Sequence, residues 1–114
     1  MERTTVDEME RTIIRQILTH ALHLNYTVIL GNGDDRYSEG GHRLSELMAL
    51  IHQSEREEIR FYDQFGSYVG DVTLGYGNEG YDVIMHYTDG EEIEALMRGL
   101  DETYDALDMM EVNA

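Results

Sequence analysis

Acidic side chains are the residues of this sequence whose number and spacing suggest chemistry most directly. The last 54 residues carry 13 Asp and Glu side chains against a single basic residue, Arg98. A chain that keeps so much like charge in one half either needs it for solubility or uses the field to attract a positively charged surface. The arrangement of these carboxylates therefore decides what kind of partner the chain is suited to bind.

The most regular array lies on a predicted final helix. At about 100° per residue, five acids fall in one stripe: Glu91, Glu94, Asp101, Asp105 and Asp108. Neighbours three or four residues apart on a helix lie about 5–6 Å from each other, which is not far from the step between successive phosphates. Acids in the C-terminal turns oppose the helix macrodipole, so helix formation alone does not explain the stripe. It predicts a partner-binding surface, with Glu79 and Asp82 as a secondary patch. The alternative is a solvated face kept for solubility.

Three other patterns have the residue types of a ligand site without its context. Gly75–Gly80 matches G-x-G-x-x-G, but it runs into a strand-like segment instead of opening a helix, which indicates a hairpin turn. His20 and His23 lie one turn apart without a third ligand, and the acids of the Gly31–Gly41 loop lack the spacing of an EF-hand. No nucleophile with a neighbouring base stands out. We therefore expect no metal, no cofactor and no enzymatic activity.

Apolar periodicity predicts the elements that hold the acids. A helical pattern over about residues 6–24 is followed by a strand at Tyr26–Leu30, a turn with a return strand near Arg36–Ser38, and a short helix around Leu44–Ile51. From Glu57 the period changes to two, which predicts a three-strand antiparallel meander ending near residue 87. The final helix is predicted to open with a capping box, Asp89-x-x-Glu92, and to bury one apolar face. Members of that face are Ile93, Leu96, Met97, Leu100, Tyr104 and Leu107.

These elements predict an α+β fold. The sheet is a hairpin plus a three-strand meander, the helices pack on one of its faces, and the order is α-β-β-α-β-β-β-α. At 114 residues with 41% hydrophobic content, the chain is expected to form a single domain over residues 1–114.

Composition restricts the function classes further. The formal net charge of −16 argues against nucleic acid or an anionic membrane as a direct ligand, because phosphates would be repelled. The sequence lacks cysteine, and its N-terminus has acids where a signal peptide needs an apolar run. These features predict a cytoplasmic protein.

Two segments carry a resemblance. Arg11-Thr12-Ile13-Ile14 and the stretch from Val69 to Thr88, with its core Tyr-Gly-Asn-x-Gly-x-Asp-Val-Ile, resemble a group of small proteins encoded by phages and mobile elements of bacteria. This mobile-element setting is similar to the one in which small acidic anti-CRISPR proteins are found. Some of those proteins mimic DNA to block type I effector complexes. The resemblance implies a mobile-element origin and supplies no catalytic residue.

The leading functional prediction is therefore an anti-CRISPR-type inhibitor. It would act as a DNA mimic that occupies the Arg/Lys surface with which a type I CRISPR effector complex holds target DNA. The alternative from a different class is a small acidic adaptor, immunity or regulatory protein that binds another basic protein surface. Adaptation to high salt is a third explanation for the acid excess, although the acids are concentrated in one half of the chain.

Overall fold

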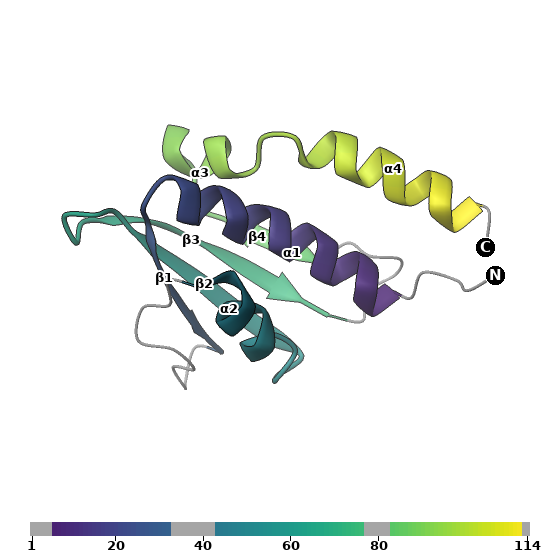
Figure 1. The fold of residues 1–114 in the computed structure, drawn as a ribbon, viewed down its shortest axis with the longest axis horizontal. Coiled ribbons are helices and arrows are strands. Elements are labelled where there is room, and N and C mark those ends of the chain that lie inside the picture. Colours follow the sequence, from purple (N-terminus) through teal and green to yellow (C-terminus); the bar gives the residue numbers. More distant parts are fainter. Residues whose placement is uncertain (1–5, 33–42, 77–82, 113–114) are drawn as a thin grey trace.

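The computed structural model describes residues 6–32, 43–76 and 83–112. Its elements are α1 (Val6–His23), β1 (Thr27–Gly31), α2 (Leu44–Leu50), β2 (Arg56–Tyr62), β3 (Tyr68–Gly75), β4 (Ile84–Tyr87), α3 (Glu91–Leu96) and α4 (Leu100–Val112). The strands form one antiparallel sheet in the order β1-β2-β3-β4, and helices pack against it (Figure 1). The predicted α+β class is confirmed, while the return strand near Arg36–Ser38 lies outside the described residues. No helix in the described part of the chain combines the length and apolarity needed to span a membrane.

Helix α1 supplies a large part of the core. Ile13, Ile17 and Leu18 have no exposed surface, and their helical spacing places them in one buried stripe. Burying each such side chain contributes about 1.5–3 kcal/mol. The helix ends where Asn25 adopts a φ of +61°, a left-handed conformation that commonly terminates helices. The predicted helix over about residues 6–24 is confirmed.

The period of two in β2 and β3 sorts their side chains between two environments. Ile59, Phe61 and Val72 have no exposed surface, whereas Arg60 is exposed. The register places Ile59 opposite Val72 on β3, and Phe61 opposite Val28 on β1. The predicted meander is confirmed as β2, β3 and β4, and β1 extends the sheet on the other side of β2.

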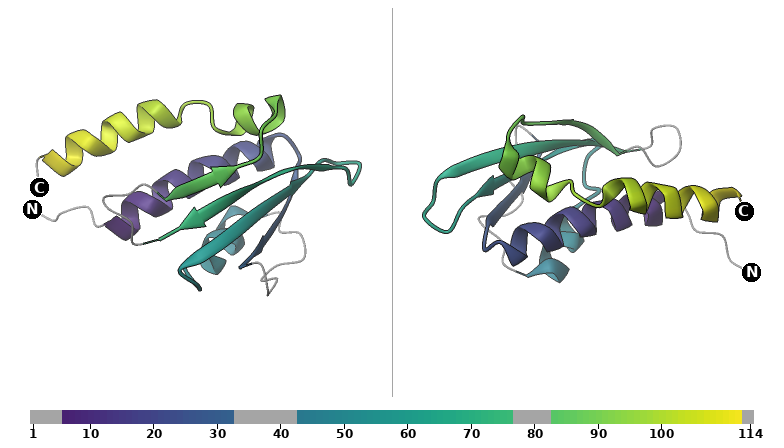
Figure 2. Two further views of the ribbon diagram at one scale, coloured as in Figure 1. Left: turned by 180° about the vertical axis from the view of Figure 1, so that it is seen from behind. Right: turned by 90° about the horizontal axis from the view of Figure 1, so that it is seen from above.

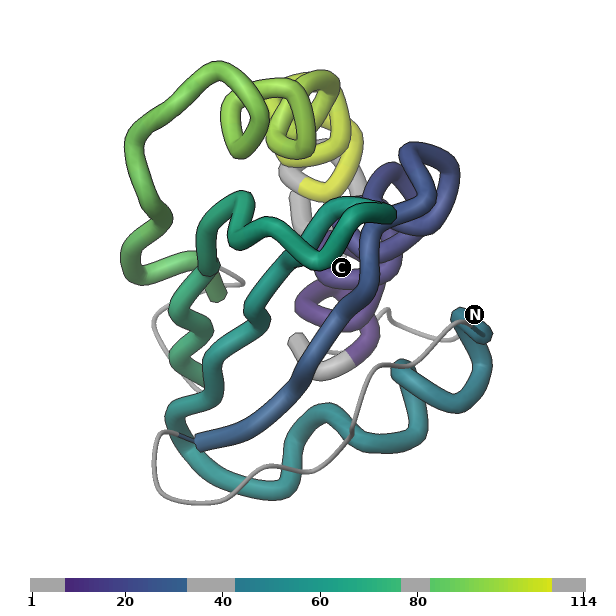
Figure 3. The backbone as a smooth tube through the Cα atoms, turned by 90° about the vertical axis from the view of Figure 1, so that its left-hand side faces the viewer, coloured from purple at the N-terminus to yellow at the C-terminus, as the bar shows by residue number. Residues whose placement is uncertain are grey.

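The helices form a layer on the buried side of this sheet. Figure 2 shows α3 and α4 running alongside α1, and Figure 3 shows the strands and the helices on opposite sides of the molecule. α3 approaches β3 at Gly70, where an added Cβ would lie only 2.6 Å from Cγ1 of Ile93. The absence of a side chain at Gly70 therefore permits this close contact.

The predicted single final helix is wrong, because the structure has two helices separated by a short turn. Gly99, just before α4, has a φ of +88°, a left-handed conformation that favours glycine. Helix α1 forms hydrogen bonds with α3 before the break and with α4 after it. Nδ1 of His20 donates a hydrogen bond to the carbonyl of Leu96 at 3.2 Å, and the hydroxyl of Thr103 donates one to Gln16. The turn is thus stabilised by a glycine in the left-handed conformation and by hydrogen bonds to another helix. Apolar periodicity alone does not predict it.

Candidate functional site

Six exposed carboxylates lie along α3 and α4. They are Glu91, Glu92, Glu94, Asp101, Glu102 and Asp105, hereafter the α3–α4 acidic surface. Four of them belong to the predicted stripe. Asp108 falls within α4, but its side chain lies outside the described residues, as do Glu79 and Asp82. The structure therefore divides the predicted stripe between two helices instead of extending it along one.

The break changes the electrostatic setting of these acids. Glu94 lies in the first turn of α3 and Asp101 in the first turn of α4, where the helix dipole stabilises an anion by typically 0.3–1 kcal/mol. The expected cap at Asp89 is replaced by Gly90, which makes no side-chain capping bond. Asp101, expected inside a continuous helix, thus occupies a favourable position at the start of a new one.

None of the six carboxylates of the α3–α4 acidic surface forms an ion pair with another described residue. Arg98 lies in the turn between the two helices and lines a groove of about 510 Å³ between α1 and α4. The carboxylates are therefore available to the positive groups of a partner.

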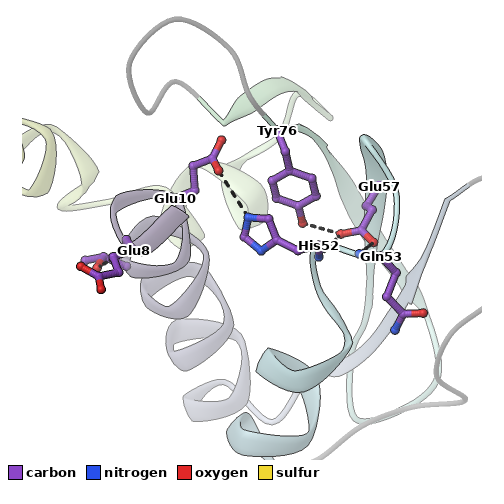
Figure 4. A network of polar contacts seen from close by, with 7 residues as sticks. Glu8, Glu10, His52, Gln53, Glu57 and Tyr76 are labelled. Atoms are coloured by element: carbon purple, nitrogen blue, oxygen red, sulfur yellow. Dashed lines mark hydrogen bonds and ion pairs between the residues drawn. The ribbon is translucent and has the colours of Figure 1, made fainter. Parts of the chain in front are cut away.

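A second polar group, which we call the buried cluster, joins Glu10, His52, Glu57 and Tyr76. Figure 4 shows these side chains converging from α1, the turn between α2 and β2, β2 and the end of β3. Glu10 has no exposed surface and Glu57 is 3% exposed. Buried carboxylates are costly unless they are hydrogen-bonded, so their surroundings must compensate for the lost hydration.

Glu57 is held by four donors. Its carboxylate accepts the backbone N–H groups of His52 at 2.9 Å, Gln53 at 3.0 Å and Ser54 at 3.3 Å, and the hydroxyl of Tyr76. Three successive N–H groups directed at one carboxylate close the turn between α2 and β2. This side chain therefore acts as the organising centre of that turn.

His52 connects this turn to α1. Its ring stacks on Tyr76 with centroids 3.9 Å apart, and its Nε2 lies 3.3 Å from Oε1 of Glu10. The backbone of His52 has a φ of +68°, which is uncommon for a residue with a side chain and is maintained here by these contacts. The buried cluster thus ties together elements far apart in the sequence.

Tyr76→Phe is expected to make the free energy of unfolding less dependent on pH above about pH 10. Burial, and then the hydrogen bond to Glu57 and its charge, raise the pKa of Tyr76 far above its ordinary value of 10.0. Because the pKa is higher in the folded state, this group's contribution is complete below the unfolded value and is lost as pH rises above about 10.

The measurement is urea unfolding at neutral pH and at several pH values above 10. Tyr76→Phe should cost about 1 kcal/mol at neutral pH and lose less further stability than the parent at high pH. Tyr62→Phe, which removes a tyrosine outside the buried cluster, should keep the parental profile. Parallel alkaline profiles for the parent and Tyr76→Phe would contradict the assignment.

The buried cluster was not predicted from the sequence, although the sequence contains signals for two of its members. Glu10 precedes Ile13, Ile14 and Ile17 by helical intervals, which places it on the buried stripe of α1. Glu57 has the same parity as the buried Ile59 in β2, so the strand period turns it toward the core. No comparable pattern marks His52, whose role depends on the left-handed turn.

The described residues do not form a metal site at the positions that the sequence suggested for one. Among the described residues, no group of three His, Asp or Glu side chains is arranged to hold a metal ion. His20 is hydrogen-bonded to the carbonyl of Leu96 at the helix break. The Gly31–Gly41 loop and the Gly75–Gly80 turn lie mostly outside the described residues.

No protein-family model, curated protein or solved structure matches this chain.

Proposed function

We propose that this protein is an inhibitor that presents the α3–α4 acidic surface as a mimic of DNA, and that its target is a type I CRISPR effector complex. The observation that supports mimicry is the set of six exposed carboxylates on α3 and α4, which have no ion-pair partner among the described residues. The formal net charge of −16 strengthens their field. The target class is supported by the resemblance of the Val69–Thr88 segment to proteins of phages and mobile elements.

Inhibition would proceed by competition for a basic surface. An effector complex that holds target DNA needs Arg and Lys side chains directed at phosphates. Carboxylates on α3 and α4 would pair with the same side chains, so that DNA and inhibitor exclude each other. The protein would act by binding alone in the cytoplasm of the bacterial cell, with neither cofactor nor catalytic step.

The direct test is a competition assay with salt as a variable. A purified type I effector complex is incubated with labelled target DNA and increasing amounts of this protein, and the bound DNA is measured. We expect full displacement of DNA at low salt, and at least a tenfold weaker inhibitor–effector complex when salt rises from about 0.05 M to about 0.3 M.

Two outcomes would count against the proposal. No displacement of DNA at low salt would exclude the effector as the target. A complex that forms with equal affinity at both salt concentrations would exclude electrostatic mimicry of DNA and favour the small acidic adaptor.

A further inference from the structure

The turn between β2 and β3 presents an aromatic side chain on a rigid support. Phe65 at its tip is 83% exposed. The carboxylate of Asp63 accepts the backbone N–H groups of Phe65 and Ser67, both at 2.9 Å, and the N–H of Asp63 bonds to the carbonyl of Ser67 at 2.8 Å. Gly66 supplies the left-handed residue of the turn, with a φ of +83°. Little conformational entropy would be lost if this tip bound a partner.

Further apolar surface lies at the same end of the sheet. The register places Tyr62 of β2 opposite both Thr27 of β1 and Tyr68 of β3. Tyr62 and Tyr68 meet edge to face with ring centroids 5.9 Å apart, and Tyr68 is 54% exposed. Figure 1 shows the β2–β3 hairpin projecting past the end of α1. Single exposed apolar residues are common on proteins, but here several belong to one projecting element.

Helix α3 borders this hairpin. α3 contacts β3 at Gly70, close to the start of that strand. Burial, and then the charges of Glu92 and Asp63, raise the pKa of Tyr26, which precedes β1. An exposed aromatic tip and an exposed acidic helix therefore share one end of the molecule (Figure 2).

We propose that the β2–β3 hairpin is a second contact of the inhibitor, in which Phe65 enters an apolar pocket of the partner beside the basic surface that receives α3. This inference rests on the proposed function and specifies its partner as a basic protein surface with an adjoining apolar pocket. Charge complementarity supports this choice, since Phe65 and the acids of α3 would meet the partner together. Exposed charges act mainly on the association rate, whereas a desolvated aromatic anchor slows dissociation.

The test is a kinetic binding measurement on an immobilised type I effector complex at about 0.05 M and about 0.3 M salt. Phe65→Ala should increase the dissociation rate at least tenfold while leaving the association rate and its salt dependence close to parental values. Its melting temperature should match that of the parent, because the Phe65 side chain is mostly exposed. The matched control is Met85→Ala, since Met85 is 54% exposed on β4, whose pairing with Leu74 places it toward the other end of β3.

The outcomes separate the two proposals. If Phe65→Ala dissociates as slowly as the parent while neutralising the acids of α3 and α4 weakens binding, the hairpin contact is wrong and DNA mimicry stands. If Phe65→Ala changes only the association rate, Phe65 is not an apolar anchor. The same conclusion follows if Met85→Ala increases the dissociation rate as much as Phe65→Ala does. If the parental protein does not bind the effector, both proposals fail.

Discussion

Replacing Glu94 by Gln, and Asp101 and Asp105 by Asn, is expected to abolish inhibition of target-DNA binding. These three side chains are exposed, belong to both α3 and α4, and form no ion pair with another described residue. If each contacts one cation of the effector at about 1 kcal/mol, losing all three raises the half-inhibitory concentration roughly 100-fold. The measurement is the DNA competition assay at low salt, where unscreened charges contribute most.

The fold of this triple variant should survive. Glu94 and Asp101 lose a favourable interaction with helix N-termini, whereas repulsion within the α3–α4 acidic surface is relieved. These opposing effects are each a fraction of a kcal/mol to about 1 kcal/mol, so we expect a melting temperature within a few degrees of the parent. Loss of inhibition with an unchanged melting temperature would then report on binding.

A matched control removes the same charge elsewhere. Glu46, Glu55 and Glu58 lie on α2, on the turn before β2 and on β2, away from the α3–α4 acidic surface. Changing all three to Gln should leave inhibition within about threefold of the parent, since only long-range charge is altered. Equal losses in both variants would assign the effect to net charge alone. Parental inhibition by the α3–α4 variant would make its acids a solvated face.

Glu57→Ala is expected to cause the largest loss of stability. The substitution leaves the backbone N–H groups of His52, Gln53 and Ser54, and the hydroxyl of Tyr76, without their shared acceptor. A buried donor left without an acceptor costs about 1–3 kcal/mol, so losing four such bonds, three of them from partly buried residues, is expected to cost roughly 3–5 kcal/mol in total. For a chain of this size, about 4 °C per kcal/mol predicts a melting temperature lower by roughly 12–20 °C.

Glu58→Ala is the control for this prediction. Glu58 is the next residue of β2, faces the other side of the sheet and is only partly buried. The two variants make the same chemical change in the same strand, so strand propensity cancels in the comparison. Glu58→Ala should cost no more than about 1 kcal/mol in urea unfolding. Similar losses in both variants would mean that Glu57 does not organise the turn between α2 and β2.

Local patterns in the sequence were sufficient for the fold class. The apolar stripe of α1 and the period of two in β2 and β3 predict a helix and strands because burial of one face imposes the same repeat on the side chains. The exposure of Glu91, Glu94, Asp101 and Asp105 also follows from the sequence. Carboxylates without a buried partner remain in water.

Tertiary structure decided where those patterns end and which polar residues enter the core. The helix break at Gly99 depends on Gln16 and His20 of α1, residues about 80 positions earlier that supply its hydrogen bonds. The burial of Glu10 and Glu57 depends on donors from other elements, because a carboxylate leaves water only where the fold replaces its hydration. Whether a charge on a periodic face is solvated or buried is thus decided by contacts between distant segments, while the period itself is local.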